Sequence, residues 1–217
     1  MRVSRLKAID NMRTMKETQT SESARAVPPP APGAERYPSL DFANSVVSVP
    51  GGRRVDLLDS PAAATRWLVE RGLAPEDARL WDFCAGKLRG LRDRTRTLIA
   101  ARIEGAPADP EAVDALNDAL TRVPTASLLH WDPVGGPYRA ASHPATQIVD
   151  HALALLAADA AELLTAPDAE RLTACGSPPC DRYLIRTHPR RHWCSVRCGD
   201  RARAARAYAR RTRAAAD

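Results

Sequence analysis

Four cysteines near the end of the chain are spaced like the ligands of a single metal ion. Cys175, Cys180, Cys194 and Cys198 form the pattern Cys-x4-Cys-x13-Cys-x3-Cys. Two close pairs joined by a short spacer can converge on one tetrahedral metal, and four thiolates suit zinc. Because four thiolates leave no open coordination position, the pattern predicts a structural Zn²⁺ site rather than a catalytic one.

Two histidines and a fifth cysteine leave alternatives to this ligand set. His188 and His192 lie between the two pairs. Either could replace a cysteine as a ligand, or both are exposed polar residues close to a phosphate. Cys84 lies apart from the cluster, beside Trp81 and Phe83, and is expected to be a buried, inert thiol. We therefore expect the four C-terminal cysteines to hold the metal.

An arginine-rich segment surrounds and follows the second cysteine pair. From Ser195 onward it consists largely of alanine and arginine, which are strong helix formers. Guanidinium groups suit phosphates and guanine edges. Eight arginines are therefore predicted to contact nucleic acid: Arg190, Arg191, Arg197, Arg201, Arg203, Arg206, Arg210 and Arg213. The last four would share one face of the helix, while Ala205, Tyr208 and Ala209 lie on another face and are expected to pack on the body of the protein.

The distribution of charge separates this segment from the rest of the chain. Residues 171–217 contain twelve arginines and three aspartates, a net charge of +9, whereas the remainder has 20 basic and 23 acidic residues. A basic end on a mildly acidic body suggests a polyanionic partner, DNA above all. The alternatives are a solubilising role, or a solvated helix whose arginines pair with the acidic body.

The elements upstream predict an α+β fold that is mostly helical. Tyr37–Val49 is predicted to be a strand, paired with Arg53–Leu57 across a Pro-Gly-Gly turn to form a small antiparallel sheet. Hydrophobic spacing and capping residues predict helices over 60–72, 77–103, 109–122 and 143–165. A hairpin is expected over 127–141 and a short strand over 182–186.

These elements divide the chain into three parts. Residues 1–34 are polar and end in a proline run, so they are predicted to be a disordered tail. Residues 35–167 form the α+β domain, and residues 168–217 form a zinc-ribbon-like module that ends in the basic helix. No apolar stretch is long enough for a secretory signal or a membrane span, so the expected location is cytoplasmic, without a membrane partner. No nucleophile or phosphate-loop motif is present, and an enzyme is not expected.

Two segments resemble known families. Trp193-Cys-Ser-Val-Arg-Cys-Gly-Asp-Arg201 resembles the CGNR zinc finger, with Asp200 in place of the motif asparagine. Leu40–Val46 (LDFANSV), Asp56-Leu57-Leu58 and the segment 66–73 (RWLVERGL) resemble the ABATE domain of stress-induced transcription regulators. Together the resemblance covers about residues 37–211.

The resemblance implies a regulatory domain fused to a DNA-binding zinc finger. It makes Cys175, Cys180, Cys194 and Cys198 the zinc ligands and Arg201 a candidate phosphate or base contact. Asp200, which would repel phosphate, is expected to cap the helix or to pair with Arg201 or Arg203.

The first hypothesis is a cytosolic, bacterial-type transcription regulator that binds DNA, with a possible homodimer. The alternative is a protein–protein adaptor that docks an acidic partner through the basic zinc module. Asp41 and Asn44 form a possible ligand site for a small-molecule effector, or else they satisfy hydrogen bonds at turns and strand ends.

Overall fold

The computed structural model describes residues 28–48, 53–123, 128–140 and 147–214. Three sequence predictions fall outside these ranges: residues 1–27 of the predicted tail, the Pro-Gly-Gly turn at 50–52, and the start of a helix at His143-Pro144. No helix within the described ranges is both long enough and apolar enough to cross a membrane.

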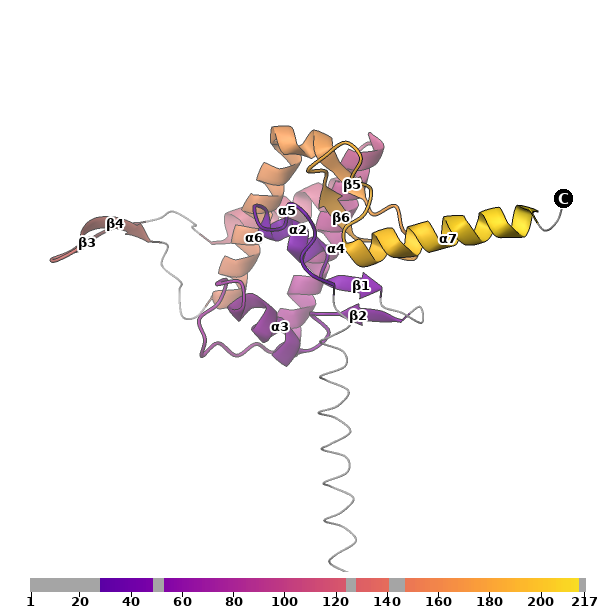
Figure 1. The fold of residues 1–217 in the computed structure, drawn as a ribbon. Helices are drawn as coiled ribbons and strands as arrows, with labels where there is room; N and C mark the ends of the chain where they lie inside the picture. The colour runs from indigo at the N-terminus through magenta and orange to yellow at the C-terminus, as the bar shows by residue number, and fades with distance from the viewer. Residues whose placement is uncertain (1–27, 49–52, 124–127, 141–146, 215–217) are drawn as a thin grey trace, which may run out of the picture.

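The body of the protein is a bundle of helices around one main core (Figure 1). Leu68, Leu88, Leu156 and Ala160 are among its buried side chains, and the rings of Phe42 and Trp67 pack against each other at a tilt of 49°. The helices are α2 (Pro38–Ala43), α3 (Pro61–Val69), α4 (Asp82–Glu104), α5 (Pro110–Arg122) and α6 (Ile148–Thr165), followed by the 3₁₀ turn η2 (Pro167–Arg171).

Local capping explains where two of these helices begin. Ser60 accepts a hydrogen bond from the backbone N–H of Ala63, and Asp109 accepts one from Glu111. In each case a proline follows at the first helical position, where its missing N–H costs no hydrogen bond. The predicted starts of α3 and α5, and the end of α5 at Arg122, are confirmed.

The described strands form three separate two-stranded antiparallel sheets. The strands are β1 (Val46–Ser48) with β2 (Arg54–Asp56), β3 (Leu128–Asp132) with β4 (Gly136–Ala140), and β5 (Leu172–Ala174) with β6 (Tyr183–Ile185). The α+β class is confirmed, and so is the hairpin predicted over 127–141, within its described residues 128–140. The zinc module has its own hairpin, β5–β6, and its second strand lies within the predicted 182–186.

The prediction of one strand over 37–49 is wrong in its first half, which forms helix α2. Nearly every side chain from Tyr37 to Val47 is buried. A segment buried on all sides has no solvent face, so its hydrophobic period cannot separate strand from helix. Pro38 then favours the start of a helix, and only residues 46–48 pair with β2.

Two predicted helix ends also move inward. The helix predicted over 60–72 is α3, and it ends at Val69 rather than at Gly72. Gly72 adopts a left-handed φ of 65°. Helix α4 starts at Asp82 rather than residue 77. Ala78 and Leu80, which precede it, are buried in the main core from a non-helical segment, so tertiary packing overrides the local start signal.

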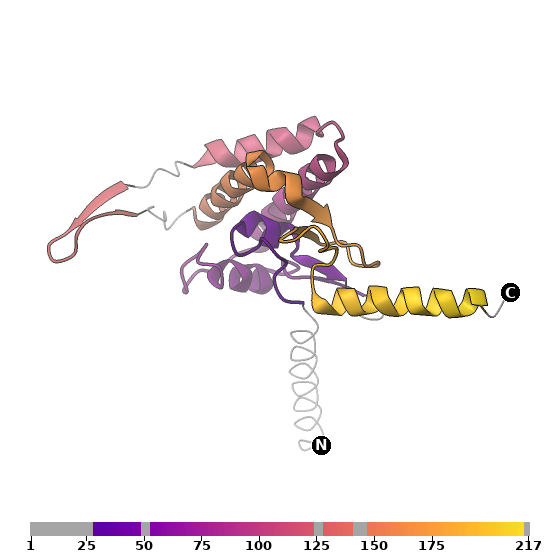
Figure 2. The same ribbon diagram turned by 45° about the horizontal axis from the view of Figure 1, so that its top comes forward.

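The C-terminal helix α7 (Val196–Ala214) leaves the body after its first turn and projects away from it (Figures 1 and 2). Only Cys198 and Gly199 of this helix are buried, and Tyr208 is 65% exposed. The prediction that Ala205, Tyr208 and Ala209 pack on the body is therefore wrong. Alanine buries little apolar area, which is too small a gain to desolvate the neighbouring arginines.

Candidate metal centre

The four C-terminal cysteines converge on one point. Their sulfur atoms all lie within 4.8 Å of one another, with Cys194 3.7 Å from Cys180 and 3.6 Å from Cys198. Bonds of about 2.3 Å to a tetrahedral zinc would place sulfurs about 3.8 Å apart. The donor set and its spacing therefore fit a closed, four-thiolate metal site.

Two turns of the backbone hold these sulfurs in place. Cys175 follows β5 and Cys180 precedes β6, and their turn is closed by hydrogen bonds from Cys175 N to Arg182 O (2.8 Å) and from Cys180 N to Ser177 O (3.0 Å). Cys194 lies two residues before α7, and Cys198 lies in the first turn of that helix. Gly176 N donates to His192 O (2.8 Å), which ties the two turns together.

Three groups donate hydrogen bonds to the sulfurs. The N–H of Cys194 lies 3.4 Å from Cys175 Sγ, the Arg201 guanidinium 3.4 Å from Cys198 Sγ, and Arg182 3.8 Å from Cys194 Sγ. A zinc ion with four thiolates carries a net charge of −2, which the two guanidiniums would offset. Hydrogen bonds from Cys175, then Cys194, lower the pKa of the Cys180 thiol, and the same bonds raise the pKa of the Cys175 and Cys194 thiols.

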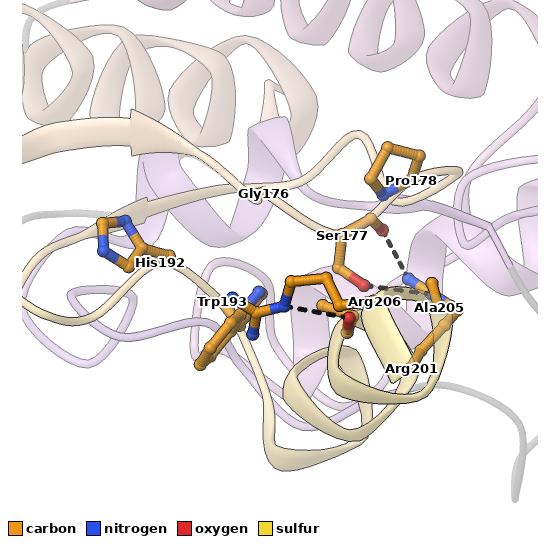
Figure 3. A pocket seen from close by; sticks show the side chains of 9 residues that line it. Gly176, Ser177, Pro178, His192, Trp193, Arg201, Ala205 and Arg206 are labelled. Atoms are coloured by element: carbon orange, nitrogen blue, oxygen red, sulfur yellow. Dashed lines mark hydrogen bonds between the residues drawn. The ribbon is translucent and has the colours of Figure 1, made fainter. Parts of the chain in front are cut away.

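The residues that follow Cys198 support the site from within the module. Arg201 donates from Nε to Ser177 Oγ (3.1 Å) and from Nη2 to Ser177 O (2.6 Å), as Figure 3 shows. Ser177 in turn donates to the backbone oxygen of Cys198 (2.7 Å). Arg201 thus joins the two metal-binding turns, and a phosphate contact by this residue stays a prediction.

Gly199 and Asp200 have equally local partners. A Cβ at Gly199 would lie 3.2 Å from the Trp193 ring, so the glycine lets this ring approach the helix. Asp200 forms an ion pair with Arg203 at 2.5 Å, which is one of the roles that the sequence left open for it. Trp193 packs against the buried cluster formed by Ala31, Leu184 and the cysteines of the site.

Two hollows flank Trp193 and collect five of the eight predicted arginines. One, of about 530 Å³, is lined by Trp193, Arg201 and Arg206 together with Ser177 and His192 (Figure 3). The other, of about 370 Å³, is lined by Arg190, Arg191 and Arg203. The remaining three, Arg197, Arg210 and Arg213, are exposed along α7.

Comparison with known families supports this description. Residues 37–167 match the ABATE family, described as "Putative stress-induced transcription regulator". The chain belongs to the ABATE family. Residues 171–211 match the CGNR zinc finger, so the resemblance found in the sequence is confirmed, and neither description is that of an enzyme. A search of curated proteins finds none that matches.

The histidines of the CGNR finger are not part of the sulfur cluster. Among the described residues, the metal-binding group consists of the four cysteines alone. His188 accepts a hydrogen bond from the backbone of Arg190 (3.1 Å), and His192 lines the larger hollow. Cys84 is half-buried against the helical core, less enclosed than predicted.

Asp41 and Asn44, the predicted ligand site of the ABATE domain, both have protein partners. Asp41 lies in α2 and pairs with Arg71 at 2.6 Å. Asn44 follows α2 and forms two hydrogen bonds of 2.8 Å with the backbone of Tyr183, one as donor and one as acceptor. These contacts favour the hydrogen-bonding interpretation, and effector binding stays a prediction.

The prediction that residues 1–34 form a disordered tail is wrong for residues 28–34, which pack on the CGNR finger. Ala31 is 1% exposed, and the carbonyl of Pro32 accepts a hydrogen bond from Ile185 N at 2.8 Å. The carbonyl of Pro29 accepts one from Arg182, also at 2.8 Å. We call residues 29–33 the strap. A proline run normally signals disorder, and only its partners in the fold mark this one as ordered.

Proposed function

We propose that this protein is a DNA-binding transcription regulator whose CGNR finger presents α7 to the DNA backbone. The observation that carries the proposal is the exposure of the α7 arginines. Within the described ranges, the one carboxylate that pairs with them is Asp200, bonded to Arg203. This observation argues against the interpretation in which the arginines pair with the acidic body.

The spacing of these arginines suits a nucleic-acid backbone. Arg203, Arg206, Arg210 and Arg213 recur every three or four residues along one face of α7. At about 1.5 Å per residue they extend over roughly 15 Å of helix. An exposed helix of this kind can enter a major groove, and its guanidiniums can bind phosphates in pairs of hydrogen bonds.

In this proposal the metal is a structural Zn²⁺ that fixes the base of α7. Cys194 and Cys198 are ligands at the start of the helix, so the ion sets the direction in which the helix leaves the body. The protein is taken to be cytoplasmic, where thiols stay reduced and available to a metal. Its zinc site has no open position and is given no catalytic role.

The proposal is tested by fluorescence anisotropy of the zinc-loaded protein with random duplex DNA at several salt concentrations. We expect binding that weakens steeply with salt. Replacing Arg206 and Arg210 with alanine should lower the slope of log K against log salt by about two. The matched control replaces Arg53 and Arg66, two exposed arginines of the body, and should leave the slope almost unchanged. No binding at low salt would contradict the proposal.

One observation favours the adaptor as a second candidate. The hollow of about 530 Å³ has an aromatic wall, Trp193, and two guanidiniums, those of Arg201 and Arg206. Such a hollow suits an acidic side chain of a partner protein as well as a phosphate. A protein without DNA affinity that still binds acidic peptides, and loses them on Arg206→Ala, would support the adaptor.

A further inference from the structure

The β3–β4 hairpin presents apolar side chains on both of its faces. Leu129 and Trp131 share one face and are 71% and 73% exposed. Leu128 and Tyr138 lie on the other face, 53% and 51% exposed, and Val134 in the turn is 98% exposed. No other described element packs substantially against the hairpin. It stands apart from the helices in both ribbon views (Figures 1 and 2).

A hairpin with this many exposed apolar side chains needs another surface to pack against. A two-stranded hairpin is marginally stable by itself in water, and it needs a further strand or a packed face. Exposed apolar side chains gathered on one element mark a site of association. The surface covering this hairpin must therefore be apolar.

The charge of the hairpin excludes a polyanion as that partner. Residues 128–140 contain one aspartate, Asp132, and one arginine, Arg139, so their net charge is zero. Surfaces that bind nucleic acid derive most of their affinity from an excess of positive charge. In both views the hairpin also points away from α7, the basic helix.

A complementary apolar surface lies on the same end of the body. Trp81 and Phe83, at the start of α4, are 77% and 72% exposed. Lys87 of α4 and Arg122 at the end of α5 both pair with Asp150 in the first turn of α6. The start of α4, the end of α5 and the start of α6 therefore meet, and the hairpin belongs to the connection between α5 and α6.

We infer that the hairpin docks on a second copy of this chain, at the surface formed by Trp81 and Phe83. Because the hairpin and this surface lie at one end, a two-fold axis at that end lets each copy cover the other's aromatic pair. The resulting contact is isologous and closed. At the observed exposures, Trp131 with Leu129 and Val134 on the hairpin, and the Trp81 and Phe83 side chains that they would cover, supply roughly 700 Å² per copy, close to a standard interface. The dimer leaves both α7 helices free.

The first test is the mass of the full-length, zinc-loaded protein by light scattering and sedimentation over a range of concentrations. We expect a dimer. Leu129→Ser/Trp131→Ser should convert it to monomer, and so should Trp81→Ser/Phe83→Ser on the opposing surface. The matched control is Val113→Ser, a 37% exposed apolar residue of α5, which should stay dimeric. A wild-type monomer at every concentration, or dimers that survive both double variants, would overturn the inference.

A second measurement keeps the inference testable if a double variant fails to fold. A photoreactive residue replaces Trp131 in otherwise intact protein, and isotopically light and heavy copies are mixed before illumination. Light-to-heavy cross-links to the peptide that contains Trp81 and Phe83 are expected. Cross-links confined within one copy, or directed to another surface, would overturn it. The salt titration of DNA binding stays separate, because a monomer also retains α7.

Discussion

Arg201 bridges the two metal-binding turns, with hydrogen bonds to Ser177 and to the sulfur of Cys198. Groups that orient ligand atoms in this way alter metal affinity when they are removed. We expect Arg201→Ala to weaken zinc binding by about 10- to 100-fold. Arg201→Lys should not restore it, because an ammonium cannot reproduce the planar donor set. Competition with a chromophoric chelator measures the effect.

The control for this experiment is Arg213→Ala, an exposed position at the far end of α7, which should leave zinc affinity unchanged. If Arg201→Ala lowers DNA affinity and its salt slope without any change in zinc affinity, Arg201 is a phosphate contact instead of a support for the site.

Gly33 carries a backbone conformation that other residues rarely adopt. Its φ is 95°, and an added Cβ would lie 2.7 Å from the Cδ1 atom of Ile185. We expect Gly33→Ala to lower the free energy of unfolding by about 2 kcal/mol. Urea unfolding of the zinc-loaded protein measures the change.

A glycine in an open position serves as the comparison. Gly90 is exposed inside α4 and an added Cβ would meet nothing within 4 Å. Gly90→Ala should therefore stabilise the protein by up to about 1 kcal/mol. Equal effects of the two substitutions would show that the strap does not pack on Ile185 in solution.

At the scale of elements, the metal should hold β5, β6 and the base of α7 in their places. Chelation of the metal removes the common partner of the four cysteines, which lie in and between these elements. We expect faster hydrogen exchange in residues 172–186 and in the first turns of α7, while amides of α4 keep their protection. Mass spectrometry of the exchange with and without chelator measures this. Identical exchange in the two states would show that the module folds without its metal.

Elements with local signals could be predicted from the sequence, and elements defined by distant partners could not. Ser60-Pro61 and Asp109-Pro110 mark the starts of α3 and α5 because capping acts within a few residues. The cysteine spacing gave the metal site for a similar reason. The role of Asn44 depends on Tyr183, 139 residues away, and the buried Arg182 looks like any other arginine of the basic end. No local sequence pattern predicts either of these contacts.

At the scale of the whole molecule, the ABATE domain and the CGNR finger share packing and hydrogen bonds. Leu172 and Ile185 of the finger belong to one buried cluster with Tyr37, Leu40 and Ile99. Arg96 donates to the carbonyls of Ala43 (2.7 Å) and Asp181 (2.9 Å), one on each side of the boundary. The body and the finger are therefore joined by packing and by hydrogen bonds on both sides of their boundary.

Asn44→Ala tests this connection, because it leaves the backbone N–H and C=O of Tyr183 without their side-chain partner. We expect a loss of about 2–4 kcal/mol in the free energy of unfolding. Zinc release should also begin at a lower temperature than unfolding of the helical core. Thermal unfolding followed by circular dichroism and by a zinc indicator measures both. The control is Asn117→Ala, at an exposed position of α5, which should change neither.

The strap joins the beginning of the described chain to Arg182 and Ile185, which are synthesised much later, and this affects the order of events during synthesis. Pro29 leaves the ribosome 153 residues before Arg182, the residue that binds its carbonyl. At about 5–20 residues per second, the strap waits roughly 8–30 s for its partner. During that interval Tyr37, Leu40 and Ile99 also lack the apolar cover of Leu172 and Ile185. A product that terminates before Leu172 keeps this surface exposed, which makes an incomplete chain prone to aggregate and recognisable to chaperones.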